Sequence, residues 1–201
     1  MMKKWAIVLF SAWFAVGAFG CATRVSRVEV GEVTDLSGRW NDTDSRLVSE
    51  EMVKDALSRP WIERFQKAHG KEPTVIVGRV LNRSHEHINV QTFTKDLERE
   101  LTNSGRVFFV AAKGEREEIR TERIDQAKHS SEETAKGPGK EIGADYMLIG
   151  SINTILDEAE GVKAKFYQVD LEMVSMADNQ KVWLGQKKIK KIVSKDKFKL
   201  F

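Results

Sequence analysis

The sequence contains a single cysteine, Cys21, among 201 residues, which excludes an intramolecular disulfide and leaves stability to an ordinary hydrophobic core. It also has little excess charge. Its 33 basic residues barely outnumber its 30 acidic ones, so we expect no broad basic surface for nucleic acid. Beyond residues 5–19, no apolar run approaches the length of a transmembrane helix. Internal repeats and low-complexity tracts are also absent.

The first twenty residues have the pattern of an export signal. Lys3 and Lys4 precede the apolar stretch at 5–19, and small residues come directly before Cys21. An apolar run of about 16 residues is too short to cross a bilayer comfortably. Small residues followed by cysteine resemble the lipobox of bacterial lipoproteins, in which the signal is removed and the cysteine is acylated. We therefore expect 1–20 to be a lipoprotein signal peptide and Cys21 to be lipidated; an ordinary cleaved signal is the alternative.

Two consequences follow from this anchor. Loss of Lys3 and Lys4 with the signal takes the basic residues from 33 to 31 (33 minus 2), against 30 acidic ones, so the mature chain is nearly neutral. By similarity to lipoprotein sorting, Ala22 in place of an aspartate after Cys21 favours the outer membrane over the inner one. More than one acyl chain makes such anchoring stable.

The rest of the sequence alternates between helical and strand patterns. Apolar residues at helical spacing predict helices at 45–58, capped by Thr43 or Asp44, and at 60–70 and 90–101. The charged run 115–135 continues this helical pattern until Gly137-Pro138-Gly139 interrupts it. Strands are predicted at 74–78, 106–111, 146–155, 167–173 and 181–192, with turns at 157–161 and 177–180. An edge strand at 28–33 is one interpretation of the valines there.

This order predicts an α+β (mixed α/β) fold. Strands separated by helices tend to be parallel, and the last two turns force antiparallel pairing. We expect a single mixed β-sheet of about four to five strands flanked by helices, with two βα crossover units followed by an antiparallel meander. The expected domain limits are a lipidated tether at 21–36, a globular domain at 37–193 and a basic C-terminal tail at 194–201.

No motif provides a plausible catalytic or metal site. Ser194 to Lys197 matches the S-x-x-K of penicillin-recognising enzymes, but the S-D-N and K-T-G partners of that motif are missing. His85 and His87 have no further ligands nearby in the sequence, and helix capping explains the polar cluster 41–44 better than Ca²⁺ binding. We therefore expect no catalytic residue, no metal and no cofactor.

Three features are candidates for interaction. Arg39, Trp40 and Asn41 combine the residue types that are common in interface hot spots, although Trp40 packed as a lid on the first helix is the alternative. The run 115–136 is either a solvated helix face or a partner-docking surface. The C-terminal lysines could bind anionic lipid or wall polymer, or belong to a disordered end; they are Lys187, Lys188, Lys190, Lys191, Lys195, Lys197 and Lys199.

Five stretches resemble the LpoB family in sequence and in order. They are 36–44 (LSGRWNDTD), 91–94 (QTFT), 116–120 (REEIR), 143–152 (GADYMLIGSI) and 167–171 (YQVDL). The resemblance covers roughly 30–190 and implies a small mixed sheet with flanking helices. It also implies an outer-membrane lipoprotein without catalytic residues that activates a bifunctional penicillin-binding protein across the peptidoglycan. Well-studied members carry a long linker rich in Pro and Gln, whereas the tether here spans at most ~55 Å.

The sequence and this resemblance together predict a non-enzymatic lipoprotein of the outer membrane that faces the periplasm. Its expected partner is a class A penicillin-binding protein, which it binds and regulates, with a role in peptidoglycan synthesis and cell shape. The alternative is a structural or assembly lipoprotein of the cell envelope that binds wall polymer, such as peptidoglycan, or a surface complex.

Overall fold

The computed structural model describes residues 25–137, 139 and 141–194. The expected signal peptide, Cys21 and the last seven residues lie outside the described residues. Residues from Val33 onward form one compact unit, and 25–32 belong to another. The edge strand expected at 28–33 is wrong. A turn occupies 30–31 instead, where the Glu32 N–H donates to the Glu29 carbonyl at 3.0 Å.

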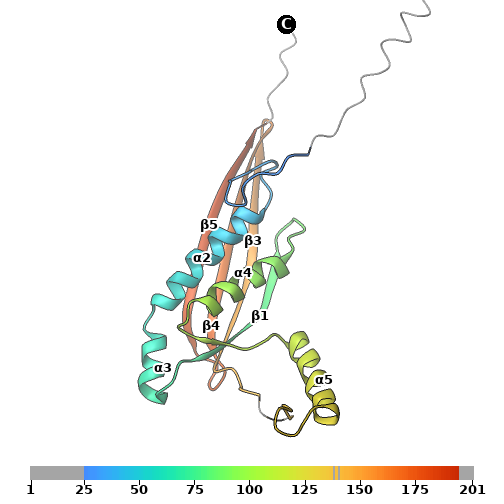
Figure 1. Ribbon diagram of the computed structural model, residues 1–201. Helices are drawn as coiled ribbons and strands as arrows, with labels where there is room; N and C mark the ends of the chain where they lie inside the picture. Colours follow the sequence, from blue (N-terminus) through green and yellow to red (C-terminus); the bar gives the residue numbers. More distant parts are fainter. Residues whose placement is uncertain (1–24, 138, 140, 195–201) are drawn as a thin grey trace, which may run out of the picture. The chain divides into compact units, whose positions relative to one another are not determined.

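Five strands form one mixed sheet in the order β2-β1-β3-β4-β5 (Figure 1). The strands are β1 (Thr74–Arg83), β2 (Phe108–Phe109), β3 (Tyr146–Ala159), β4 (Val162–Ser175) and β5 (Lys181–Ser194). β1 is parallel to both β2 and β3, whereas β3, β4 and β5 pair antiparallel. The predicted mixed sheet, with two crossovers and a meander, is therefore confirmed.

The two hairpins of the meander follow from residues that accept a left-handed backbone. Glu160 and Gly161 have φ of 49° and 82°, the positive values that a two-residue hairpin turn of the primed type requires. The turn is thus shorter than the 157–161 expected, because β3 continues to Ala159. Asn179, with φ of 62°, turns the chain between β4 and β5 within the predicted 177–180.

Four helices occur in the described part of the chain: α2 (Asp42–Ser58), α3 (Trp61–His69), α4 (Val90–Asn103) and α5 (Lys113–His129). The cap expected at Thr43 or Asp44 is wrong, because Asn41 is the N-cap of α2. The Asn41 side chain accepts from the Asp44 N–H at 3.0 Å, and the Asp44 carboxylate accepts from the Asn41 N–H at 3.0 Å. This reciprocal capping box satisfies two backbone donors, so the helix begins three residues earlier than expected.

Two other boundaries differ from the sequence prediction. α5 ends at His129, where Ser130 is already extended, so Gly137-Pro138-Gly139 does not interrupt a helix. β5 continues to Ser194 and includes Lys187, Lys188, Lys190 and Lys191, which are therefore strand residues rather than part of a tail. Alternation along the strand gives these lysines two faces, so they do not form one basic patch.

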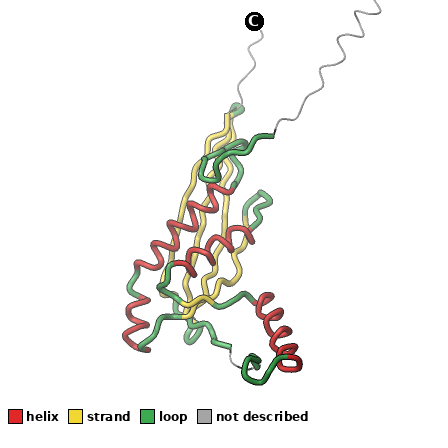
Figure 2. Tube along the Cα trace, in the orientation of Figure 1, coloured by secondary structure: helices red, strands yellow, loops and turns green. Residues whose placement is uncertain are grey.

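The core lies between the sheet and the helices α2 and α4, which cover one of its faces (Figures 1 and 2), and Trp61 and Ile62 of α3 also belong to it. The alternation predicted for β4 is confirmed. Tyr167, Val169, Leu171 and Met173 are buried, and the residues between them are partly exposed. Each fully buried side chain of this kind contributes roughly 1.5–3 kcal/mol. Within the described residues, no helix is both long and apolar enough to cross a membrane.

Candidate docking surfaces

A cavity of about 660 Å³ lies where the chain enters the domain. We call it the Trp40 cleft. Its walls come from the segment before α2, the loop after β1 and the adjoining ends of β3, β4 and β5. The lining residues are Ser37, Arg39, Trp40, His85, Glu86, His87, Thr154, Ile155, Leu156, Lys163, Lys165 and Val193. Its size is that of a typical ligand or peptide-side-chain pocket.

Glu86 holds three sides of the Trp40 cleft together. Its carboxylate accepts from the Lys165 ammonium at 2.6 Å, from the Tyr167 hydroxyl at 2.8 Å and from the Trp40 N–H at 3.3 Å. Partial burial by itself would raise the pKa of Glu86, but the bonds from Lys165 and Tyr167 hold it below its ordinary value. Burial, and then the bond to Glu86, raise the pKa of the Tyr167 phenol. Glu86 is therefore ionised and accepts these bonds at neutral pH.

Lys191 performs the same role on the neighbouring strand. Its ammonium donates to Asp35 at 2.6 Å, to Asp44 at 2.7 Å and to the Arg39 carbonyl at 3.2 Å. Burial by itself would lower the pKa of Lys191, but the two carboxylates raise it above its ordinary value. The bond from Lys191 likewise lowers the pKa of Asp35. The segment before α2 is thereby fastened to β5.

These ion pairs follow from the register of the sheet. Lys165 and Lys191 lie directly opposite each other on β4 and β5, where two like charges repel. Each lysine therefore needs its own carboxylate, supplied by Glu86 for one and by Asp44 for the other. Sequence analysis did not identify this group. The sequence gives one indication of it: Lys165 lies two residues before Tyr167 and therefore on the same, buried face of β4.

The three residues predicted to bind a partner occupy different environments. Trp40 is half-buried and packs edge-on against Phe93, with ring centroids 6.0 Å apart, and against Tyr167, at 5.7 Å. Asn41 caps α2, and Arg39 is exposed at the rim of the Trp40 cleft. Trp40 is thus a lid, but on α4 and β4 rather than on the first helix alone. Partner binding by these residues stays a prediction.

Gly38 allows the segment before α2 to lie close to β5. Its φ is +62°, and a β-carbon there would lie 2.2 Å from the side chain of Val193. Its carbonyl also accepts from the Tyr167 hydroxyl at 3.2 Å. A residue with a side chain would both strain this backbone and push the segment away, so glycine is required at this position.

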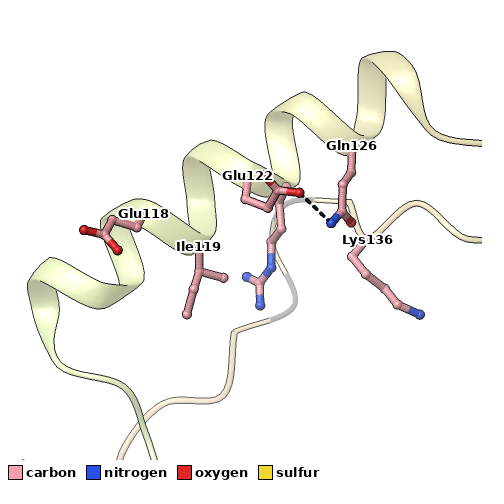
Figure 3. A pocket seen from close by; sticks show the side chains of 6 residues that line it. Glu118, Ile119, Glu122, Gln126 and Lys136 are labelled. Carbon is pink, nitrogen blue, oxygen red and sulfur yellow. Dashed lines mark hydrogen bonds between the residues drawn. The ribbon is translucent and has the colours of Figure 1, made fainter.

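A second candidate surface surrounds α5, none of whose residues is buried. The helix is attached through Glu115, which binds Lys95 of α4, and through Arg120, which donates to Glu141 at 2.8 Å. A cavity of about 360 Å³ lies along one side of α5, and Figure 3 shows Ile119 on that side. In the same view, Gln126 donates to Glu122 at 3.0 Å. The charged run is therefore a solvated helix face whose partner-docking role is open.

Neither surface offers a cluster of metal ligands among the described residues. Across residues 25–137, 139 and 141–194, no three His, Cys, Asp or Glu side chains converge as metal ligands would. The backbone N–H and the ring of His85 both contact the Thr154 hydroxyl at 3.2 Å. Ser194, the first residue of the S-x-x-K match, is the last residue of β5. The chemistry available at both surfaces is that of ion pairs and apolar contact, which suits docking.

Comparison with known proteins places the chain in a family. The model of the peptidoglycan-synthase activator LpoB matches residues 44–189, which run from the first turn of α2 into β5. The LpoB C-terminal domain from Escherichia coli is 18% identical, with a TM-score of 0.38, over 70% of this chain and 97% of that one. The LpoB C-terminal domain from Salmonella enterica is 19% identical, with a TM-score of 0.35, over 65% and 93%. Lipoprotein GNA1162 from Neisseria meningitidis is 13% identical, with a TM-score of 0.37, over 63% and 88%.

No curated protein sequence matches the chain. The family model, in contrast, spans well over half of its residues and nearly every element of the compact unit. The chain belongs to the LpoB family of peptidoglycan-synthase activators.

Proposed function

We propose that the protein is a non-enzymatic lipoprotein of the outer membrane that binds and regulates a class A penicillin-binding protein in the periplasm. The observation that carries this proposal is the family match over 44–189. Because the match includes α2, α4 and the whole sheet except the last residues of β5, it concerns the entire folded unit and not one motif. The proposal adds two things to family membership: the class of the partner and the lipid anchor.

The proposed anchor is Cys21, acylated after removal of residues 1–20. The chain between Cys21 and Val33, where the compact unit begins, is 12 residues long and reaches at most ~43 Å. Such a short tether keeps the domain close to the membrane that holds it. The synthase must therefore approach that membrane, or the gap between the two must be narrow where the protein acts.

The anchor is testable by a single substitution. Cys21→Ser should give a protein that incorporates no metabolically supplied palmitate and does not fractionate with the outer membrane, while the domain stays folded. Ala22→Asp should keep the label but shift the protein towards the inner membrane. A wild-type chain that takes up no palmitate and is released as a soluble periplasmic protein would refute the anchor.

The Trp40 cleft is the proposed contact surface around Arg39. The cleft is lined by the exposed Arg39 and the half-buried Trp40, and its floor is rigid because Glu86 ties three elements together. A rigid floor suits docking, since little side-chain entropy is lost on binding. Trp40 and Asn41 contribute mainly by holding Arg39 in place.

Purified full-length protein should be mixed with each class A penicillin-binding protein of the same cell, and both binding and glycan polymerisation measured. We expect one synthase to bind and its polymerisation rate to change. Arg39→Glu should weaken binding by about tenfold, the size expected for one charged contact. Arg64→Glu, an exposed charge reversal on α3, is the matched control and should have no effect.

The same preparation tests the alternative function, an envelope lipoprotein that binds wall polymer. Four of the lysines that suggested polymer binding lie on β5: Lys187, Lys188, Lys190 and Lys191. Lys187 pairs with Glu51, and Lys191 pairs with Asp35 and Asp44. The strand therefore carries less free positive charge than the sequence suggests. Sedimentation with peptidoglycan sacculi at low and high salt distinguishes the two. Salt-sensitive sedimentation together with no effect on any synthase would favour the alternative.

A further inference from the structure

A groove of about 320 Å³ lies between the edge strand β2 and α5. We call it the β2–α5 groove. Phe108 and Phe109 line it from β2, Arg116 and Ile119 line it from α5, and Ile142 lines it from the segment before β3. The groove is distinct from the Trp40 cleft, with which it shares no residue.

The walls of the β2–α5 groove are unusually apolar for a surface. Phe108, Ile119 and Ile142 are 59%, 42% and 67% exposed. Large apolar side chains that gather at one exposed place mark interaction sites more often than chance surface exposure does.

The backbone of β2 can accept another strand. The N–H of Phe108 donates to Pro73 and that of Val110 to Val75, at 2.9 and 3.0 Å, which uses the inner side of the strand. The alternate residues, Phe109 and Ala111, therefore turn their N–H groups to the outer side. β2 ends the sheet. A strand of two residues offers few groups for pairing, but neither residue is a lysine or a proline.

The groove also carries an unbalanced positive charge. Arg116 and Arg123 line it, and its one acid, Glu141, already receives two bonds from Arg120 at 2.8 Å and one from Arg123 at 3.4 Å. In the described part of the chain, the buried Nε of Arg116 has no hydrogen-bond partner. A buried donor without a partner is costly. Arg116 as a whole is only partly buried, so a carboxylate from outside can bind its guanidinium.

We propose that the β2–α5 groove binds an extended segment of the synthase, which adds to β2 as a further strand. Main-chain bonds to Phe109 and Ala111 fix its register, apolar side chains pack on Phe108 and Ile119, and one carboxylate binds Arg116. This inference rests on the proposed function and specifies the chemistry of the partner: extended, apolar and acidic.

A second copy of the chain is a poorer occupant. The other edge of the sheet, β5, carries five lysines. Lys181, Lys187 and Lys191 are paired with carboxylates, so this edge would bring the positive charge of Lys188 and Lys190 to an arginine-lined groove. If β2 paired with β2 of a second copy, Arg116 and Arg123 of one groove would face the same arginines of the other. Like charges across an interface suppress the wrong partner. The charge of the groove therefore selects an acidic segment of another protein.

Photo-cross-linking of the full chain to its synthase tests the site directly. The photoreactive residue p-benzoyl-phenylalanine is placed at Phe108, with Leu184 of β5, equally exposed, as the control position. We expect Phe108 to capture one synthase peptide with acidic and apolar residues, and Leu184 to capture none. Capture of a second copy, or of no synthase peptide while the synthase is still bound and regulated, would overturn the groove but leave the proposed function intact.

Two variants measure the parts of the groove. Arg116→Ala should weaken synthase binding at least tenfold, whereas Arg64→Ala on α3 should not. Ala111→Pro removes only an outward N–H and should weaken binding without unfolding the protein, which circular dichroism verifies. Unchanged affinity in both folded variants would refute strand addition. If the wild-type chain bound no synthase at all, the groove and the proposed function would fall together.

Discussion

The helices α2 and α5 are the same length, 17 residues, but they are held in place in opposite ways. α2 buries nine of its residues, including Val48, Met52 and Val53, whereas α5 buries none. Isolated helices of this length are marginal in water, so α2 gets its stability from packing. α5 must depend on local interactions and on a few attachments at its surface.

The attachments of α5 are exposed ion pairs. Glu115 binds Lys95 and accepts from the Ala112 N–H at 2.9 Å, and Arg120 and Arg123 share Glu141. Exposed pairs contribute roughly 0–1 kcal/mol each, much less than buried apolar side chains. α2 therefore contributes most to the stability of the domain, whereas α5 contributes little.

The largest expected effect comes from the packed helix. Met52→Ala in α2 should lower the free energy of unfolding by about 3 kcal/mol, because a buried methionine is lost and a cavity remains. Ile119→Ala in α5 should change it by less than about 0.5 kcal/mol. Urea denaturation of the two variants measures both values. Equal destabilisation would show that α5 belongs to the core after all.

The ion pair that fastens the segment before α2 should have the next largest effect. Lys191→Met should cost about 2–3 kcal/mol, since the buried Asp44 loses its cation. Lys190→Met, next in the chain but exposed on the other face of β5, should be nearly neutral. A loss of stability equal for both lysines would assign the effect to overall charge and not to this pair.

Stability should also depend on pH through Glu86. Its pKa in the folded protein is below the ordinary value of 4.5, so the folded state binds fewer protons and its stabilisation is present above that value. It is lost as the pH falls through the folded pKa. Glu86→Gln should therefore cost about 1–2 kcal/mol at pH 7 and much less once the pH is below the folded pKa. Thermal unfolding at several pH values, with Glu63→Gln as an exposed control, measures this difference.

Loss of the ion pairs that attach α5 should have the smallest effect on global stability. Its effect should be confined to that helix. Glu141→Gln removes the acceptor shared by Arg120 and Arg123, so amide hydrogen exchange in α5 should quicken while that in α2 stays the same. The midpoint of global unfolding should not move. Amide exchange that quickens equally in α2 and α5 would show that Glu141 supports the whole domain and not α5 alone.

Much of the fold could be predicted from the sequence because its elements carry strong local signals. The alternation of Tyr167 to Met173 gave the buried face of β4, and the helical spacing of Val48, Met52 and Ala56 gave that of α2. Boundaries were less predictable. Asn41 caps α2 instead of Thr43 because the reciprocal bond with Asp44 depends on backbone geometry that the order of polar residues does not show.

The surfaces were harder to predict, because they depend on contacts between distant segments. Glu86 looked like one more polar residue of a loop, yet it meets Lys165 and Tyr167 about 80 positions further along the chain. Arg116 looked like part of a solvated run, but the crossover after β2 places it in a groove beside the edge strand of the sheet. Charge counts cannot distinguish Lys191, which is paired with two carboxylates, from Lys190, which is exposed on the other face of β5.

One measurement tests the central claim most directly: glycan polymerisation by the cell's own class A penicillin-binding proteins, with and without the purified full-length protein. The account predicts that the rate of one synthase changes, that the protein alone polymerises nothing, and that Arg39→Glu and Arg116→Ala reduce the effect. No change for any synthase, together with no binding, would contradict it.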